Sequence, residues 1–170
     1  MSLSTTHPIF TTCGGSPYQV VRATVQARFL SGRARVESLT RHWDNTNREG
    51  YCLLCKDLNP VLGTMEHLFL SGGCPALAEA RLSMLSFFAA FMVPRPYLLP
   101  LVKACWDVNK SLSMQLLLDC SVIPIIISET QRSEFPVLKD LFYLTRACVF
   151  KIYSERDYLR QNRDYWGPFS

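Results

Sequence analysis

The sequence predicts a mainly α-helical fold, in which a small zinc-knuckle hairpin is inserted between an N-terminal helix pair and the C-terminal helices. Apolar residues between Leu138 and Ile152 recur at three- and four-residue steps, the spacing of one face of a helix. The stretch from Leu77 to Phe91 is apolar over most of a helical circumference, which is typical of a buried helix. Because 48% of the residues are hydrophobic, we expect a folded core rather than disorder.

A flexible arm and a pair of helices are expected before the hairpin. Residues 1–17 are rich in Thr, Ser, Gly and Pro, which predicts a flexible arm. Residues 18–50 predict a basic helix pair, whose first helix, 18–30, ends at a Ser-Gly pair. The second, shorter helix is expected over 33–43, with a polar loop after it.

The zinc knuckle is expected over residues 51–76 and a helical domain over residues 77–165. Pro75 suits the first turn of a helix, where its missing N–H has no intrahelical partner to lose. The helix that follows, 76–93, is apolar nearly all round, so we expect it to lie centrally in the core.

The rest of the domain is predicted to consist of helices and one irregular connection. Pro124 argues against a central strand in the β-branched run 121–127, so an extended connection is expected there. The remaining helices are expected at 96–108, at 111–119 with Ser111 as N-cap, and at 136–160.

Three cysteines and a histidine form the most informative pattern in the chain. Two residues separate Cys52 from Cys55, and six separate His67 from Cys74. Thiolate and imidazole are the ligands that structural zinc prefers, and four of them complete a tetrahedron. We therefore predict one structural zinc ion bound by these four residues, although the second spacing is looser than in most knuckles.

The alternative is that these four are unrelated core residues, because free cysteine is often buried as a small apolar side chain. The sequence around the first pair is polar, with Asn47 and Glu49 before it and Lys56 and Asp57 after it. Two buried core thiols rarely come from such a stretch, and this favours the metal site.

The remaining cysteines are assigned no chemistry. Residues 1–8 lack a basic flank and an apolar segment, so we expect no signal peptide and an intracellular location, nuclear or cytoplasmic. Disulfides are disfavoured in such a compartment, and Cys105, Cys120 and Cys148 are predicted to be buried free thiols. Cys13 is given no role. No apolar run reaches the ~18–20 residues of a membrane span, so no membrane partner is expected.

Positive charge gathers just before the metal loop. Only Glu37 and Asp44 oppose it between residues 22 and 48. Arginine pairs with phosphate in a bidentate manner, so we expect a nucleic-acid-binding surface, with a solvated helix face as the alternative. The candidate residues are Arg22, Arg28, Arg33, Arg35, Arg41 and Arg48. A second positive surplus lies near the C-terminus, at Arg146, Lys151, Arg156, Arg160 and Arg163.

Several short segments together form a known arrangement, an arginine-bearing helix pair before a Cys-Cys-His-Cys knuckle with a Glu-His-Leu core. They are Arg28-Phe-Leu-Ser-Gly-Arg33, Leu39-Thr-Arg-His-Trp43, Cys52-Leu-Leu-Cys55, Gly63-Thr-Met-Glu-His67-Leu and Cys74-Pro75. In these segments the chain resembles the C-terminal zinc-binding region of non-LTR retrotransposon reverse transcriptases. The resemblance covers roughly residues 18–160, with the specific motifs in 28–75, and it implies the same four zinc ligands. The family commonly spaces its His and last Cys by four residues, and here the gap is longer.

The expected function is a zinc-stabilised nucleic-acid-binding module of retrotransposon origin, with RNA a more natural partner than DNA. We expect no catalysis, since the chain has no Tyr-x-Asp-Asp polymerase element and no Asp-x-Glu-x-Lys nuclease cluster. The alternative is a helical protein–protein interaction domain in which zinc pins a loop. A hydrolase has no motif to support it, because nothing in the sequence brings its Ser-His or Cys-His pairs together.

Overall fold

The computed structural model of the chain describes residues 7–34, 36–40, 48–55, 60–70, 72–100, 102–103, 110–122 and 136–162. Within these ranges the regular structure is helical, which confirms the predicted mainly-α fold, and the extended backbone pairs at one antiparallel bridge, between Tyr51 and Leu62. The α-helices are α1 (Pro8–Thr11), α2 (Pro17–Leu30), α3 (Glu37–Thr40), α4 (Met65–Phe69), α5 (Ala78–Met92), α7 (Lys110–Asp119) and α9 (Pro136–Asn162). Among the described helices, none combines the length and apolar character needed to cross a bilayer.

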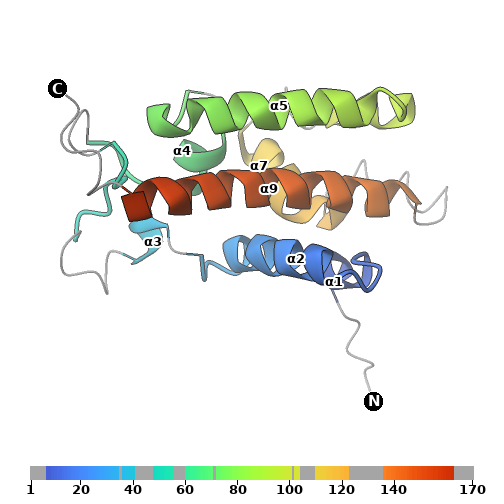
Figure 1. Cartoon of the computed structure of the whole chain (residues 1–170), viewed down its shortest axis with the longest axis horizontal. Helices are drawn as coiled ribbons and strands as arrows, with labels where there is room; N and C mark the ends of the chain where they lie inside the picture. The colour runs from blue at the N-terminus through green and yellow to red at the C-terminus, as the bar shows by residue number, and fades with distance from the viewer. Residues whose placement is uncertain are drawn as a thin grey trace, which may run out of the picture.

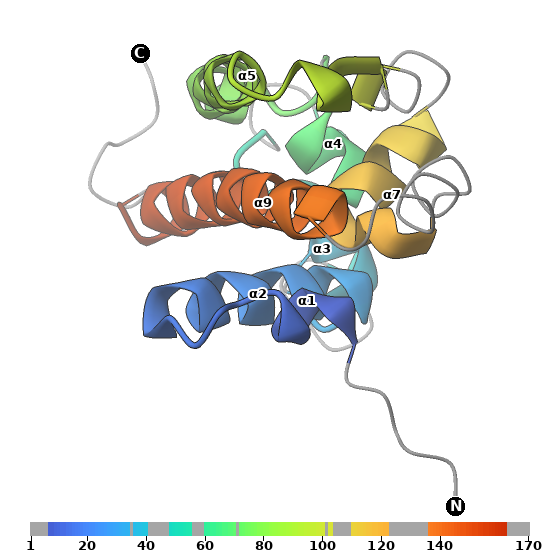
Figure 2. The same ribbon diagram turned by 90° about the vertical axis from the view of Figure 1, so that its right-hand side faces the viewer.

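The long C-terminal helix α9 is the centre of the fold. It lies between α5 and α2, and α7 and α4 also contact it (Figures 1 and 2). Because neighbours cover it on several sides, α9 buries a broad set of side chains: Leu141, Phe142, Leu144, Cys148, Val149 and Ile152. The predicted helix 136–160 and its packing against the helix after the knuckle are both confirmed.

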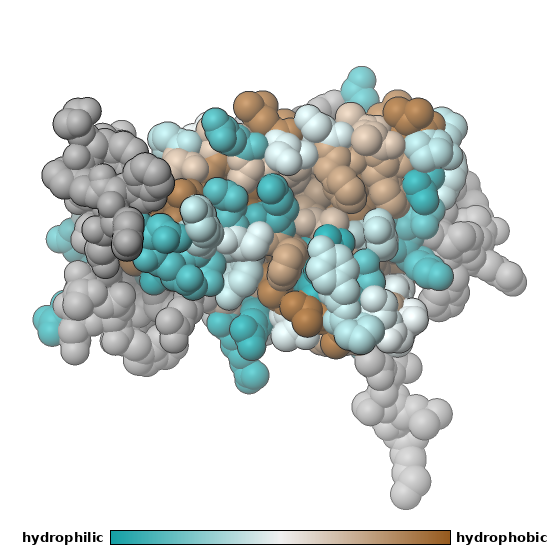
Figure 3. Space-filling view, in the orientation of Figure 1, coloured by the Kyte–Doolittle hydropathy of each residue, from teal (hydrophilic) through white to brown (hydrophobic). Residues whose placement is uncertain are grey.

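The helix α5 is not central, and the prediction that it would be is wrong. It packs one stripe, including Met84 and Phe88, toward the core, while Leu82 is 63% exposed and Leu85 and Phe87 also face solvent. Hydrophobic side chains accordingly gather over α5 on the molecular surface (Figure 3). The apolar character of a helix does not determine how many of its faces other helices will cover. In this fold α9, and not α5, is the helix that neighbours surround on several sides.

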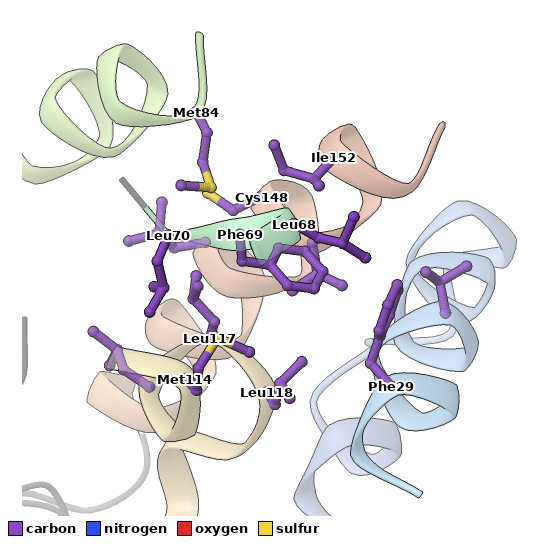
Figure 4. Packing of buried hydrophobic residues seen from close by; sticks show 14 of the residues in the cluster. Phe29, Leu68, Phe69, Leu70, Met84, Met114, Leu117, Leu118, Cys148 and Ile152 are labelled. Atoms are coloured by element: carbon purple, nitrogen blue, oxygen red, sulfur yellow. The ribbon is translucent and has the colours of Figure 1, made fainter. Parts of the chain in front are cut away.

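The helix α2 begins one residue before the predicted helix 18–30 and ends, as predicted, at Leu30. Ser31 is its C-cap, and Gly32 then adopts a φ of +68°. That left-handed conformation is cheap only for a residue without a Cβ. Inside the core, Phe29 packs edge-on to Phe69 with ring centroids 5.0 Å apart (Figure 4). This contact joins α2 to the helix α4 that carries one of the predicted metal ligands.

Other segments depart from expectation in detail. The helix expected over 33–43 is described only as α3, and residues 41–47 lie outside the described ranges. Ser111 is the second residue of α7 and therefore not its N-cap. The helix expected over 96–108 begins as a 3₁₀ turn, Pro96–Leu98, and positions 104–109 are not described, Cys105 among them. Most of the connection expected over 121–127 also lies outside the described residues.

The N-terminal segment corrects the prediction of a flexible arm, at least from residue 7 onward. Ile9 on α1 is 1% exposed, and Cys13 is buried beside it. The Cys13 sulfur lies 3.5 Å from Nη1 of Arg146, a fully buried residue of α9. The segment that begins at residue 7 therefore packs against the core through a few apolar and polar contacts, although its composition is typical of a loop.

Candidate metal centre

The four predicted ligands converge in the structure. The sulfurs of Cys52, Cys55 and Cys74 and a ring nitrogen of His67 all lie within 4.8 Å of one another. The Cys52–Cys74 sulfurs are 3.9 Å apart, the Cys55–Cys74 sulfurs 3.3 Å, and Cys55 Sγ is 3.4 Å from His67 Nε2. A tetrahedron with zinc-like bond lengths has edges of about 3.8 Å between sulfurs and about 3.6 Å from sulfur to nitrogen. The cluster could therefore hold one metal ion.

The first two ligands come from a short hairpin. Its ladder joins the Cys52 N–H to the Val61 carbonyl at 2.8 Å and the Gly63 N–H to the Gly50 carbonyl at 2.9 Å. At its tip, the Cys55 N–H donates to the Cys52 carbonyl at 3.1 Å, which closes a tight turn. Both thiols are buried, and the turn directs them to one point.

The third ligand, His67, is held by the short helix α4. The Thr64 hydroxyl caps this helix by accepting from the His67 N–H at 3.2 Å. The next two residues, Leu68 and Phe69, are fully buried and anchor α4 in the core (Figure 4). The imidazole is thereby positioned from a rigid element rather than from a loose loop.

The long gap between His67 and Cys74 is folded back by its glycines. Gly72 has a φ of +76°, and the Cys74 N–H reaches the His67 carbonyl at 2.7 Å. A Cβ on Gly73 would lie 2.1 Å from that same carbonyl oxygen. The extra residues therefore do not displace Cys74 from the cluster, because the glycines let the backbone of the loop pass directly over His67.

Gly73→Ala tests this arrangement. The added methyl cannot coexist with the Cys74–His67 hydrogen bond, so Cys74 should move and metal affinity should fall at least about tenfold, the loss expected for about 1.4 kcal/mol. Competition with a chromophoric chelator measures the affinity. Gly72→Asn is the matched control, because asparagine tolerates a positive φ and a Cβ there meets nothing within 4 Å. Wild-type affinity in Gly73→Ala would contradict the account.

The electrostatics of the cluster favour metal binding at Cys74 and His67 and oppose it at Cys52. A hydrogen bond from the Cys52 thiol lowers the pKa of Cys74, while that bond and burial raise the pKa of Cys52. Burial, followed by the charge of Arg81, lowers the pKa of His67, which keeps the imidazole neutral at physiological pH. Metals bind thiolate and neutral imidazole, so one ligand is predisposed to ionise and another is already in its binding form.

Arg81 of α5 stabilises the backbone around the site. Its guanidinium donates to the carbonyl of Cys74 at 2.6 Å and to that of Leu68 at 3.3 Å, and the residue is buried. Three thiolates around a divalent ion carry one net negative charge, which the buried guanidinium offsets. Sequence reasoning missed Arg81. Its charged side chain within the apolar stripe of a helix was the available clue.

A buried ion pair joins α3 to α9. Glu37 Oε1 and Arg156 Nη2 are 2.7 Å apart, with the two side chains 4% and 3% exposed. Glu37 lies against the hairpin, because a Cβ on Gly63 would fall 2.6 Å from its other carboxylate oxygen and 3.2 Å from the Cys52 Cα. Gly63 is thus required to be glycine by a neighbour that sequence reasoning did not connect with it.

The structure describes four of the six arginines predicted to bind nucleic acid. Arg28 and Arg33 are exposed at the end of α2, whereas Arg22 stacks on Tyr18, its guanidinium carbon 4.0 Å from the ring centroid. Arg48 is exposed beside the hairpin. Arg35 and Arg41 lie outside the described residues.

Of the remaining cysteines, Cys120 and Cys148 are buried free thiols, as predicted. Burial raises the pKa of Cys148, so it stays protonated in the core.

Comparison of the chain with protein-family models, with curated proteins and with solved structures gives no match.

Proposed function

We propose that this protein is a zinc-stabilised module that binds RNA and has no catalytic activity of its own. The cluster of Cys52, Cys55, His67 and Cys74 carries the proposal. Three cysteine sulfurs and one histidine nitrogen, all within 4.8 Å of one another, are the donor set of structural zinc sites. Because four protein ligands fill the tetrahedron, no position is left for the water or substrate that a catalytic zinc needs.

RNA is proposed as the partner because exposed cationic side chains lie at the end of α2. The hairpin, α3 and the C-terminal end of α9 lie at the same end of the molecule (Figure 1). Arg28 and Arg33 are exposed and follow one another around the end of α2. Guanidinium groups suit phosphate, and unpaired RNA bases add stacking that duplex DNA does not offer. The motif segments in 28–75 support an origin in a non-LTR retrotransposon reverse transcriptase.

Filter binding of the zinc-loaded protein to mixed single-stranded RNA tests this function. We expect a complex at low salt whose log K falls linearly with log salt, by ~0.7 for each phosphate contact. Removing zinc with a chelator should abolish most of the binding, because the hairpin would no longer be held. Absence of a complex at micromolar protein and low salt would reject RNA binding.

A protein–protein interaction domain is the second candidate, and the exposed apolar side chains of α5 favour it. Leu82, Leu85 and Phe87 of α5 are exposed although they are large and apolar. Hydrophobic side chains gather over this helix on the surface (Figure 3). Exposed apolar patches often mark interaction surfaces. The two candidates differ in salt dependence, since apolar docking is little weakened by salt whereas phosphate binding is weakened steeply.

A further inference from the structure

A groove of about 520 Å³ lies between the end of α2 and the last turns of α9. Both helices end at the same side of the molecule, and hydrophilic side chains gather over the C-terminal half of α9 (Figures 1 and 3). Arg28, Arg33, Arg156 and Arg160 line the groove, with Asp157 as the single carboxylate among its lining residues. The groove is therefore strongly cationic.

These arginines are not all committed to the protein. Arg156 is held by Glu37 in the buried ion pair. Within the described residues, the ion pairs involve none of the guanidinium groups of Arg28, Arg33 and Arg160. Arg28 and Arg33 are exposed, and Arg160 is half-buried. Three cationic side chains thus converge on one groove without forming an ion pair to any carboxylate that the structure describes.

Helix termini alone do not explain this convergence. Arg28 and Arg160 lie in the last turns of α2 and α9, where a cation interacts favourably with the helix dipole. Arg33 belongs to neither helix, yet it lines the same groove. The interaction with a helix dipole needs only a positive charge, so lysine would serve equally well. Phosphate, in contrast, can form two parallel hydrogen bonds with the planar guanidinium group of arginine.

Two aromatic residues are among those that line the groove, the buried Phe29 and the half-buried Tyr153. They pack edge to face with their centroids 6.1 Å apart. An aromatic surface beside cationic side chains is the combination that single-stranded nucleic-acid sites use for base and backbone. The volume falls within the ~300–1,000 Å³ range of ligand sites, enough for a short part of a strand.

We infer that this groove binds the phosphodiester backbone of single-stranded RNA through Arg28, Arg33 and Arg160, with an unpaired base against Tyr153. The inference rests on the proposed function and deepens it, because it gives the RNA a defined path. It adds Arg160 to the sequence-based set and leaves Arg22, which stacks on Tyr18, outside the site.

The inference is tested with the triple variant Arg28→Ala, Arg33→Ala, Arg160→Ala in the full chain, by RNA filter binding across a salt series. Loss of three phosphate contacts should lower the salt slope by about 2, at ~0.7 each. The triple variant Lys103→Ala, Lys139→Ala, Lys151→Ala is the charge-matched control, because these lysines are exposed and lie outside the groove. The same three arginines changed to lysine should restore only part of the binding. Zinc content and helical circular dichroism should match wild type in every variant.

The outcomes separate the two proposals. If wild type binds RNA and the two alanine triples behave alike, the groove is wrong and RNA binding stands. If wild type binds no RNA, both proposals are wrong. Displacement of the RNA by polyglutamate at equal charge would show that the groove takes acidic peptides, and would overturn its assignment to RNA.

Discussion

Replacing Cys52 and Cys55 together by serine is expected to abolish zinc binding and to remove more than about 4 kcal/mol of stability. A ligand whose free concentration is 1,000 times its Kd stabilises the folded state by about 4.1 kcal/mol. Structural zinc sites usually have a binding free energy larger than this value. The wild-type chain should contain one zinc ion, by elemental analysis after extensive dialysis. Urea unfolding followed by circular dichroism measures the loss, and chelator treatment of the wild type should reproduce it.

Cys148→Ala is the control, since Cys148 is also a fully buried thiol but lies on α9 within the core. It should keep one zinc ion and lose only about 1 kcal/mol, the cost of a small cavity. A wild-type chain without zinc, or a serine double variant that retains it, would leave the cluster as four core residues.

Arg156→Met is expected to destabilise the protein by about 3–5 kcal/mol, because it leaves the Glu37 carboxylate buried without its partner. The double variant Glu37→Gln, Arg156→Met should recover part of this loss, since no buried charge then remains. Zinc affinity should also fall in the single variant, because Glu37 packs against Gly63, which in turn lies beside the Cys52 backbone. Urea unfolding and chelator competition measure the two effects.

The pair of Arg95 with Asp140 provides the comparison. It is about 30% exposed on both sides, at 3.0 Å. Arg95→Met should cost at most about 2 kcal/mol, including the stacking of Arg95 on Phe91, since exposed ion pairs contribute little. If Arg95→Met and Arg156→Met lower the free energy of unfolding equally, the buried ion pair contributes no more to stability than the exposed one.

Ligand chemistry was predictable from the sequence, and the groups that support it were not. Cys52, Cys55, His67 and Cys74 stand out because few residue types bind zinc, and their short separations allow them to meet. Arg81 and Glu37 reach the cluster through packing of α5 and through the pairing with Arg156, which is 119 residues from Glu37 along the chain. Single-sequence spacing carries no information about such a distant partner.

The fold was also predictable from the sequence only in part. Helix positions follow from local periodicity, and α2 and α9 were predicted close to their observed bounds. Which helix becomes central depends on how many neighbours surround it, so α5 was placed in the core and α9 occupies that position. The docking of Ile9 and Cys13 was likewise hidden, because loop-like composition does not reveal a tertiary contact with Arg146.

The order of the contacts along the chain has a consequence for biosynthesis. During translation, α2, α4, α5 and α7 all leave the ribosome before α9, the helix on which they pack. At a translation rate of about 5–20 residues per second, the apolar faces of these helices stay uncovered for several seconds until α9 has been synthesised. The metal ligands need no such delay, since Cys52 and Cys74 are only 22 positions apart. A nascent chain can therefore bind its ion first, and the helix α4, held to the hairpin by that ion, then offers Leu68 and Phe69 for packing when α9 emerges.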